Sequence, residues 1–587
     1  MTTPPVLRIF ALSFLLSGPF PGVILAAVPA TTPAVFARDG IVASSHGLAS
    51  EAGAQILRQG GNAVDAAVAT GFALAVVLPS AGNIGGGGFM VVHQADGRDT
   101  VIDYRETAPA AASRGMYLGT GGKVLSGPDS STVGWRAAGV PGTVAGLAFA
   151  LEHYGSGKIT WAQAIEPARR LAAEGFVVSG TTEHRLRRAA ALLGQFEESK
   201  RIYLKGGSGW RAGETFRQPE LAATLERLQR AGWREFYEGE TARRIAAAMH
   251  REGGTITLAD LKNYRIAERA PLRGAYRGYT VVTMPPPSSG GIALLQMLGM
   301  LEARDVGALR NDPAARAHLF AEVMTRAFRD RAEYLGDPAF VQVPVAQLLD
   351  PAYIRARMNS FSPNRATPSA SVEPGLGRLP VSPPRESLQT THFSVVDAAG
   401  GAVSNTYTLN GAFGCGATVP GTGILLNNEM DDFMSAPGVP NLFGLIQGES
   451  NAITPGKRPL SSMTPTLLLR SGKLFLVTGS PGGPTIINTV LQVVTNTIDL
   501  GMPPCAAVAA PRIHHQWMPD RLDYEPGALT PAALAQLRAE GHILAVSADS
   551  IGDSETIEVD PATGVRLGAS DPRNGDSAAV AQTPVSH

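Results

Sequence analysis

The spacing of apolar and polar residues predicts helices in the first and middle parts of the chain. Ser50 and Asn62 are the expected N-caps of two helices, over residues 50–59 and 63–78. Most of the stretch 161–358 has the pattern of helices with charged faces. Shorter β-type runs predict strands at residues 89–93, 100–104, 279–282, 466–470 and 474–478.

Two further β-type runs, residues 390–396 and 402–408, enclose a short turn that ends in glycine. A three-residue hairpin loop of this kind is a standard connection between antiparallel strands. The register that it sets places Thr390 opposite Thr408, about 4.5–5.5 Å apart at Cβ. Threonine is also a good strand residue, so the spacing alone leaves open whether the pair has a chemical role.

The position of Thr390 predicts a precursor that cuts itself. The threonine follows residues 361–388, which are rich in proline and serine and are expected to form a loop or linker. A threonine hydroxyl is a poor nucleophile at neutral pH and needs a base beside it. The α-amine of the same threonine can be that base once the chain is cut between Gln389 and Thr390.

A glycine-rich turn, GSPGG at residues 479–483, lies between a predicted strand and a helix expected over residues 485–499. Such a turn can present N–H groups to an oxyanion, but this motif alone favours a tight turn without chemistry. The chain has no Gly-x-Ser-x-Gly elbow, P-loop or tandem dinucleotide fingerprint. Ordinary serine hydrolases, P-loop NTPases and dinucleotide enzymes are therefore disfavoured.

The 587 residues include 50 basic and 50 acidic side chains, which argues against nucleic acid as a partner. Residues 1–30 have the features of a signal peptide, with Arg8, an interrupted apolar stretch and small residues at Ala27 and Ala30. A membrane anchor would need an unbroken apolar run of about 18 residues, and this segment has none. We therefore expect a periplasmic or secreted protein.

The chain has two cysteines, Cys415 and Cys505, which are too few for a disulfide scaffold, and the sequence leaves their pairing open. No Cys or His spacing typical of a metal site occurs. The adjacent His514 and His515 are expected in a loop or in the core. We expect neither a metal nor a cofactor.

Several motifs follow one another along the chain in a fixed order. Before the predicted cut they are GGNAVDAA (60–67), NIGGGGF (83–89) and DYRETAP (103–109). After it they are TTHFSVVD (390–397), NNEMDDF (427–433), KRPLSSM (457–463) and GSPGG (479–483). Together they resemble the γ-glutamyltransferases (γ-glutamyltranspeptidases), and the resemblance runs from about residue 43 to residue 573.

This resemblance implies an α+β N-terminal-nucleophile hydrolase fold, a four-layer αββα sandwich matured by autoproteolysis. Residues 31–389 would form a large subunit and residues 390–587 a small catalytic subunit, held together as a heterodimer. The implied activity is cleavage of the γ-glutamyl amide of glutathione and related compounds through a γ-glutamyl-Thr390 intermediate. Water, amino acids or peptides would accept the γ-glutamyl group.

The family's catalytic roles fall on four residues of this chain. Thr390 would be the nucleophile, Thr408 would hold and polarise its hydroxyl, and Gly482 and Gly483 would form the oxyanion hole.

Six other residues would recognise the amino-acid end of the γ-glutamyl group. Arg105, with Ser461 and Ser462, would bind the α-carboxylate, because a guanidinium suits a bidentate grip. Asn410, Glu429 and Asp432 would hold the α-ammonium. Without the resemblance, Arg105–Glu106 would be interpreted as a surface ion pair and Asp431–Asp432 as a helix or turn cap.

The chain departs from the family at two positions. The segment 437–444 resembles a lid loop, and Phe443 stands where members often carry a tyrosine whose hydroxyl could latch the lid through Asn410. We predict a looser lid for this reason. At Glu429 some relatives carry glutamine, and either side chain suits the ammonium.

Three alternatives remain. A cephalosporin (glutaryl) acylase-like amidase would share Thr390 and the autocleavage, but its glutaryl substrate lacks the α-amine that Asp432 suits. A non-catalytic secreted binding protein on this scaffold is disfavoured by the intact Thr390, Thr408, Arg105 and glycine pair. A structural protein has no repeat or coiled coil to support it.

Overall fold

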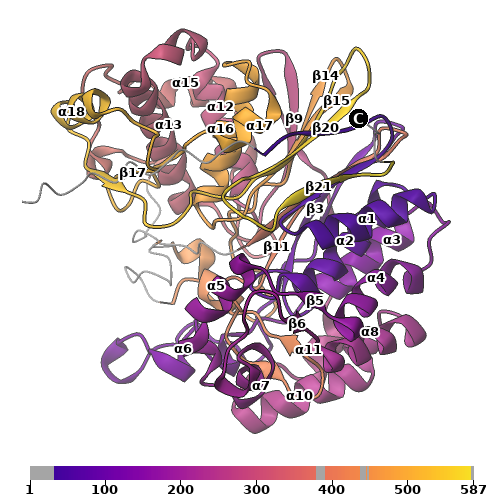
Figure 1. Ribbon diagram of the computed structural model, residues 1–587. Coiled ribbons are helices and arrows are strands. Elements are labelled where there is room, and N and C mark those ends of the chain that lie inside the picture. Colours follow the sequence, from indigo (N-terminus) through magenta and orange to yellow (C-terminus); the bar gives the residue numbers. More distant parts are fainter. Residues whose placement is uncertain (1–31, 378–389, 436–444, 446–447, 584–587) are drawn as a thin grey trace, which may run out of the picture.

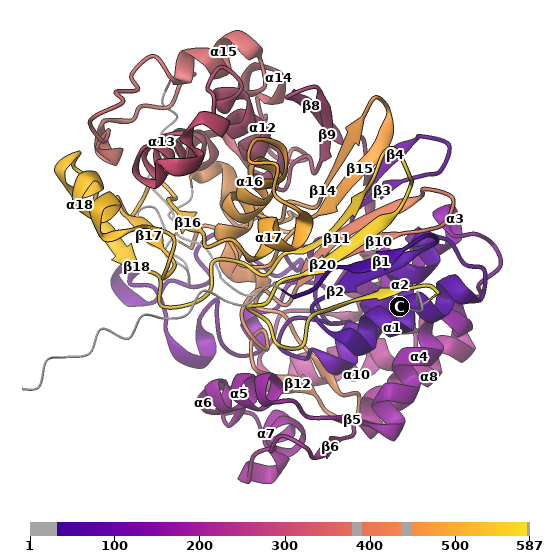
Figure 2. The same cartoon turned by 45° about the horizontal axis from the view of Figure 1, so that its top comes forward.

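Two seven-stranded sheets lie face to face between two layers of helices (Figures 1 and 2). The computed structural model describes residues 32–377, 390–435, 445 and 448–583. Sheet A has the strand order β1 (Val35–Ala37), β20 (Arg566–Ser570), β19 (Glu555–Val559), β15 (Lys473–Thr478), β14 (Thr466–Arg470), β9 (Tyr279–Thr283), β8 (Leu272–Tyr276). Sheet B has the order β21 (Ala578–Ala581), β2 (Ile41–Ser44), β10 (Thr391–Val396), β11 (Ala402–Thr408), β3 (Gly87–His93), β4 (Asp99–Asp103), β7 (Ala267–Arg269).

The helices divide between the two outer faces. Those on the sheet B side are α1 (Gly47–Arg58), α2 (Ala63–Val77), α3 (Thr143–Tyr154), α4 (Trp161–Glu174), α5 (Gly180–Arg188), α6 (Ala190–Leu193), α7 (Glu197–Tyr203), α8 (Pro219–Ala231), α9 (Glu235–Glu238), α10 (Glu240–Glu252) and α11 (Leu258–Asn263). Those on the sheet A side are α12 (Gly290–Leu301), α13 (Pro313–Tyr334), α14 (Val345–Leu348), α15 (Pro351–Arg357), α16 (Thr485–Ile498) and α17 (Pro504–Ala509). Beyond them, α18 (Pro531–Ala539) lies near a small sheet of β16 (Ile513–His514), β17 (Leu522–Tyr524) and β18 (Leu544–Val546).

Successive side chains point to opposite faces of each strand, and three large hydrophobic cores result. In β3, Met90 and Val92 belong to the core under the helices of sheet B, whereas Phe89 and Val91 face the other sheet. In sheet A, Leu468 packs under the helices and Leu467 faces inward. Both faces of each sheet are therefore buried, and the four-layer αββα arrangement that the resemblance implies is confirmed.

The stretches before and after the predicted cut contribute strands to both sheets. In sheet B, β10 and β11 lie between β2 and β3, which come from the first stretch. In sheet A, β14 pairs with β9 from the first stretch. The two pieces therefore share both sheets and the large hydrophobic cores on either side of them.

Most predicted elements are confirmed within one or two residues, but the start of α1 is not. Asn62 caps α2 with a capping box to Asp65, as expected. In α1 the cap is His46, whose side chain accepts from Leu48 N, so the predicted cap at Ser50 is wrong. The Ser50 hydroxyl instead lies 2.7 Å from both Ser44 Oγ and the Ala578 carbonyl.

The structure also bears on the expectations for the cysteines, the paired histidines and a membrane span. Cys415 and Cys505 are both free thiols. His514 and His515 are buried, and His514 Nδ1 lies 2.7 Å from Asn488 Nδ2. Across the residues that the structure describes, no helix combines the length and apolar character needed to cross a membrane. The predicted signal peptide, Gln389 and Phe443 lie outside the described residues.

Candidate active site

Thr390 lies directly before β10, one of the inner strands of sheet B. The β10–β11 ladder pairs Thr391 with Tyr407 and continues without a shift to Val396 opposite Ala402. Extended by one residue, this register sets Thr390 opposite Thr408, as the turn chemistry predicts. The turn itself is held by Asp397, whose carboxylate accepts from Ala399 N and Gly401 N at 2.9 Å.

Thr408 ends β11 beside the glycine-rich start of β3. It is buried, pairs with Gly87, and its hydroxyl accepts from Asn410 N at 2.8 Å. Asn410 has a φ of 73° and donates from Nδ2 to the Asn428 carbonyl at 2.9 Å. A Cβ on Gly87 would come within 2.5 Å of the Tyr104 carbonyl, so only glycine lets this strand approach the DYRETAP segment.

The turn GSPGG connects β15 to α16 and bends at its two last glycines. Gly482 and Gly483 have φ values of 128° and 56°, and a Cβ on Gly482 would lie 2.3 Å from Thr485 Oγ1. Thr485 Oγ1 donates to the Gly482 carbonyl at 2.8 Å. The carbonyl is thereby turned toward the helix, and the N–H of Gly483, in the same trans peptide unit, points the opposite way.

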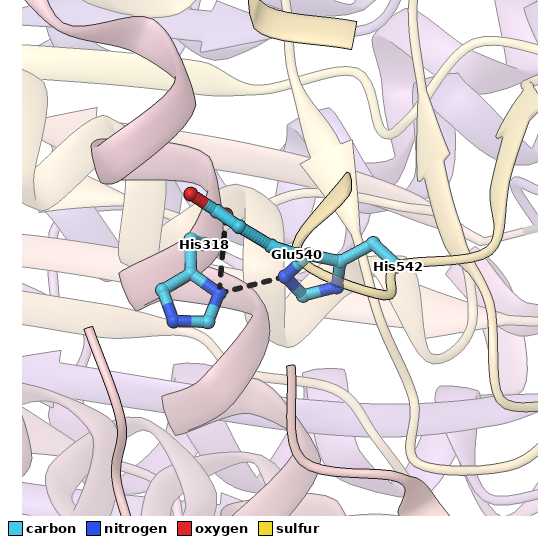
Figure 3. Close-up of side chains that lie close together, drawn as sticks. All are labelled: His318, Glu540 and His542. Atoms are coloured by element: carbon cyan, nitrogen blue, oxygen red, sulfur yellow. Dashed lines mark hydrogen bonds and ion pairs between the residues drawn. The ribbon is translucent and has the colours of Figure 1, made fainter. Parts of the chain in front are cut away.

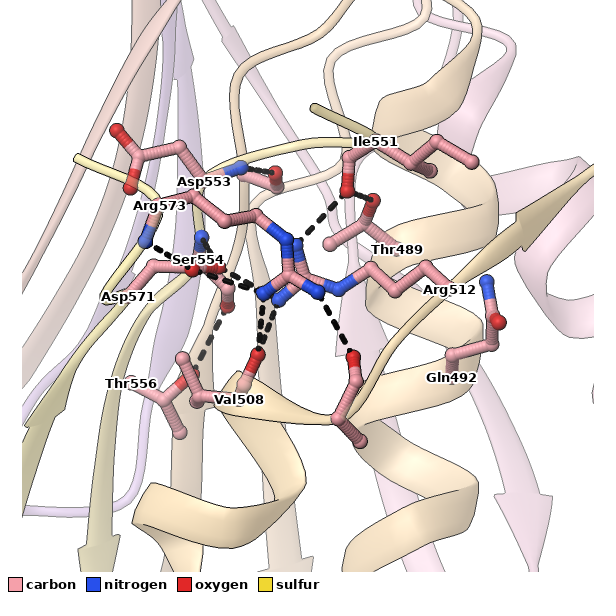
Figure 4. Close-up of polar contacts among 12 residues, drawn as sticks. Thr489, Gln492, Val508, Arg512, Ile551, Asp553, Ser554, Thr556, Asp571 and Arg573 are labelled. Carbon is pink, nitrogen blue, oxygen red and sulfur yellow. Dashed lines mark hydrogen bonds and ion pairs between the residues drawn. The ribbon is translucent and has the colours of Figure 1, made fainter. Parts of the chain in front are cut away.

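A polar network around Asp571 (Figure 4) contacts this turn through Ser554. Ser554 Oγ donates to the Gly479 carbonyl at 2.9 Å, and Ser554 N donates to Asp571 at 2.9 Å. Asp571 also accepts from Arg512 at 2.6 Å and from Arg573 at 2.9 Å. Burial alone would raise the pKa of Asp571, but the two guanidinium groups hold it below its usual value. The turn thus rests on a fixed, ionised support.

His392 is a second support that sequence reasoning missed. It is fully buried, with Nδ1 2.9 Å from Thr406 Oγ1 and Nε2 3.1 Å from Ser394 Oγ. A Cβ on Gly479 would overlap the His392 ring, so the ring packs directly against the turn. Burial lowers the pKa of His392 to about 3, which keeps the ring neutral. Its place two residues after Thr390 was the available signal.

A cavity of about 560 Å³ opens beside these elements. Thr390 and Gly482 both line it, together with Phe413 and Asn574. Basic side chains, among them Arg185, lie on its wall. The predicted nucleophile and one predicted oxyanion glycine therefore face the same space.

The predicted recognition residues form a separate buried cluster around Arg105. Arg105 is fully buried and donates to Glu429 and to Asp432, which lie in the short helix η7 (Glu429–Asp432). It also donates to the carbonyls of Pro459 at 3.3 Å and Leu460 at 3.2 Å. The interpretation of Arg105 as part of a surface ion pair is therefore wrong.

The charges of this cluster depend on one another. Burial alone would lower the pKa of Arg105, but Glu429, Asp432 and Glu106 raise it above its usual value. Burial raises the pKa of Glu429 well above its usual value despite Arg105. The Glu106 carboxylate lies 4.0 Å from the guanidinium, and burial raises its pKa to about 7. Three carboxyl groups therefore surround one permanent cation.

Ser461 and Ser462 lie directly after the carbonyls that Arg105 contacts. Both are buried, and the Ser462 hydroxyl accepts from Arg331 at 3.1 Å. Arg331 also donates to Ser289 Oγ at 2.8 Å, and Ser289 Oγ donates to the Ser461 carbonyl at 2.7 Å. Arg331, in α13, is a residue that sequence reasoning did not single out.

The topology explains why these residues gather. The start of β10, the end of β11, the start of β3 and the end of β4 lie side by side, at the same end of the strands of antiparallel sheet B. Thr390, Thr408 and Arg105 stand at or just beyond these strand ends. Among the described residues, the six predicted recognition residues do not line the cavity that Thr390 lines.

Comparison with known proteins gives one consistent picture. Residues 49–581 match the sequence model of the family described as Gamma-glutamyltranspeptidase. The chain is 46% identical over 588 residues to the glutathione hydrolase proenzyme of Escherichia coli (strain K12), covering 98% of this chain and 99% of that one.

Solved structures agree. The cephalosporin acylase from Bacillus halodurans has a TM-score of 0.82 at 28% identity and covers 97% of this chain and 99% of its own. A chain of Helicobacter pylori γ-glutamyltranspeptidase has a TM-score of 0.55 at 43% identity and covers 57% of this chain and 95% of its own.

Proposed function

The chain belongs to the γ-glutamyltranspeptidase family, and we propose that it cleaves the γ-glutamyl amide of glutathione and related compounds. One observation carries the proposal: a buried guanidinium that is paired with two carboxylates, Arg105 with Glu429 and Asp432. A free amino-acid end carries the complementary pair of charges, a carboxylate and an ammonium. When the substrate binds, its α-carboxylate pairs with the Arg105 guanidinium and its ammonium pairs with the carboxylates of Glu429 and Asp432. Each buried charge therefore keeps a partner of opposite charge.

The chain first cuts itself between Gln389 and Thr390. The Thr390 hydroxyl attacks the carbonyl carbon of Gln389, the peptide C–N bond breaks, and the acyl group passes to the threonine oxygen. Water hydrolyses this ester and leaves a carboxylate on Gln389 and a free α-amine on Thr390. Thr408, opposite Thr390 in the ladder, orients the hydroxyl in both reactions.

The freed threonine then turns over the substrate. Its α-amine takes the hydroxyl proton as the oxygen attacks the γ-carbonyl, and the N–H groups of the Gly482–Gly483 turn stabilise the oxyanion. The donor's amine leaves with that proton, and a γ-glutamyl ester remains on Thr390. Water or the amine of an amino acid or peptide then attacks the ester and restores the threonine. Ser461 and Ser462 assist Arg105, and Asn410 assists the two acids.

The cavity beside Thr390 supplies room for the part of the donor that leaves and for the acceptor. Both sheets contain strands from residues 31–389 and from residues 390–587, which supports a heterodimer that stays assembled after the cut. The signal-peptide features of residues 1–30 support a periplasmic or secreted location. No metal or cofactor takes part in these steps.

A glutaryl amidase is the second candidate, because a cephalosporin acylase shares the fold at a TM-score of 0.82. Its substrate would leave Glu429 and Asp432 without an ammonium to bind. The charge of η7 therefore favours γ-glutamyl donors.

Denaturing mass spectrometry of the purified protein tests the nucleophile, and chromogenic amides test the donor. The wild type should give two fragments that meet at Gln389 and Thr390, and a Thr390→Ala variant one intact chain. Thr391→Ala, a substitution of the next strand residue, is the control and should still be cut. The processed enzyme should hydrolyse a γ-glutamyl anilide at least about tenfold faster than a glutaryl anilide. An uncut wild type, or a preference for the glutaryl anilide, would overturn the proposal.

A further inference from the structure

Outside the candidate active site, two histidines and a glutamate converge near α18 (Figure 3). His318 lies in α13, Glu540 is the C-cap residue of α18, and His542 follows two residues later. One ligand atom from each lies within 4.8 Å of the others. The His318 side chain is 1% exposed and that of Glu540 is 9% exposed.

The His318 ring is fixed so that one lone pair faces its two neighbours. Its Nε2 lies 2.7 Å from the Ser362 carbonyl, and a carbonyl can only accept, so this nitrogen carries the proton. In a neutral ring with Nε2–H, Nδ1 is the nitrogen with the lone pair, and it lies 2.7 Å from His542 Nε2. A histidine whose outer nitrogen donates to a backbone carbonyl is the usual second-sphere arrangement of metal ligands.

Glu540 supplies an independent indication. Its Oε1 accepts from Gln536 at 2.9 Å, whereas Oε2 is buried without a hydrogen-bond partner, 3.9 Å from His318 Nδ1. A buried carboxylate oxygen without a donor is costly and calls for an explanation. A cation between Oε2 and the two rings would provide it.

The distances suit a small tetrahedral ion. Two ligands at about 2.0–2.1 Å from zinc lie about 3.3 Å apart. The His318–His542 separation of 2.7 Å would open, and the His318–Glu540 separation of 3.9 Å would close, each by about 0.6 Å.

We propose that His318, Glu540 and His542 form a binding site for Zn²⁺, with His318 Nδ1, His542 Nε2 and Glu540 Oε2 as ligands and a water as the fourth. For His542 Nε2 to bind the ion, the proton between Nε2 and His318 Nδ1 moves through solvent to His542 Nδ1, so each ring keeps one N–H. His542 is half-buried and next to the exposed Gly541, so the ion has a route from solvent. Sequence spacing gives no signal for this cluster, because 222 residues separate His318 from Glu540.

The site would also join the two products of autocleavage. His318 belongs to residues 31–389, and Glu540 and His542 belong to residues 390–587. Only this consequence rests on the proposed function; zinc binding itself does not require the cut. An ion with ligands on both pieces stabilises the assembled pair over the separated pieces by mass action.

The test is zinc binding by the untagged, processed protein, first stripped with chelator and then dialysed against Zn²⁺. We expect about one zinc per heterodimer by elemental analysis, and visible absorption of tetrahedral type when Co²⁺ replaces it. At free zinc about 100-fold above the dissociation constant, Tm should rise by roughly 3 °C. His318→Ala and His542→Gln should each lose the zinc, the Co²⁺ absorption and the shift.

His250→Ala is the matched control, because His250 is exposed at the end of α10. It should bind zinc as the wild type does. His542→Gln replaces a half-buried ring with a side chain of similar length, so it tests the site if His318→Ala fails to fold. Wild-type protein that binds no zinc, or full binding by a folded His542→Gln variant, would overturn the proposal. The γ-glutamyl assay is not a readout here, so failure of the proposed function would not imitate either result.

Discussion

Arg105 and Asp432 lie 327 residues apart in the chain and meet as a buried ion pair. Removing charges from water costs several kcal/mol per ion, and the cost is recovered only when each charge keeps its partners. Arg105 meets this condition through Glu429, Asp432 and two backbone carbonyls. The pair is therefore sensitive to the loss of either charge and suited to exchanging partners with a zwitterion.

Asp432→Asn should lower kcat/KM for a γ-glutamyl anilide by about 10²–10³-fold. Breaking a buried pair by removing one partner costs about 3–5 kcal/mol, and the substrate ammonium loses the same partner. Hydrolysis of a glutaryl anilide, which has no ammonium, should fall less. Steady-state kinetics with both anilides measure the difference.

Asp431→Asn is the control for this substitution. Asp431 is the neighbouring buried carboxylate in η7, and it accepts from Ser131 instead of Arg105. It should change the ratio of the two activities little. Equal losses on both substrates in Asp432→Asn would show that Asp432 supports the fold and does not recognise the ammonium.

Thr408→Ala should slow both autocleavage and turnover by about tenfold or more. The substitution removes the hydroxyl opposite Thr390 and leaves Asn410 N without the acceptor it has at 2.8 Å. Thr408→Ser keeps the hydroxyl and should recover most of both rates. The appearance of the two fragments over time, followed by mass spectrometry, gives the first rate. Normal processing by a folded Thr408→Ala variant would exclude the proposed role.

Gly482→Ala should reduce kcat by about 10²–10³-fold, the usual effect of losing one oxyanion donor. Its φ of 128° is unfavourable for alanine, and the new Cβ would lie 2.3 Å from Thr485 Oγ1, so the turn must move.

Gly472→Ala is the matched control. Gly472 has a φ of 78° in the β14–β15 hairpin turn, and nothing lies within 4 Å of an added Cβ. It should cost stability without a comparable loss of kcat. Comparable losses of kcat in the two variants would point to strain and not to a lost donor.

Local chemistry was sufficient to predict the hairpin that carries Thr390. Its register follows from a three-residue turn, and the observed pairing of Thr391 with Tyr407 is the predicted one. The N-cap of α1 could not be predicted in the same way. Ser50 has a good capping side chain, but its hydroxyl binds the Ala578 carbonyl, 528 residues away. Long-range packing decides such a choice.

In the candidate site, too, residues marked by local sequence could be predicted, and residues that depend on long-range contacts could not. Sequence pattern alone singled out Thr390. It offered Thr408 and the GSPGG turn as candidates, with a purely structural role open for Thr408 and favoured for the turn. Arg105 needed the family resemblance, since its partners lie more than 300 residues away in the chain. The support from Arg331 and His392 was found only in the structure. No spacing points to Arg331, and the place of His392 two residues after Thr390 does not by itself show that its ring packs against the GSPGG turn.

The last prediction concerns Glu106, the third carboxyl group beside Arg105. Burial raises its pKa from 4.5 to about 7, against the opposing effect of Arg105. Between these pH values the folded protein holds a proton that the unfolded chain has released. Folded-state stability from this group is therefore complete below pH 4.5 and is lost as the pH rises through 7. The loss is about 3 kcal/mol at most.

Glu106→Gln removes this titration, so the Tm of the variant relative to the wild type should rise between pH 4.5 and 7 and level off above. Thermal melts of both processed proteins across this range measure the difference. Glu252→Gln serves as the control, because Glu252 is exposed at the end of α10 and pairs only with its neighbour Arg251 among the described contacts. A Tm difference between Glu106→Gln and the wild type that stays constant from pH 4.5 to 7 would mean that Glu106 is ionised throughout, and that Arg105 outweighs its burial.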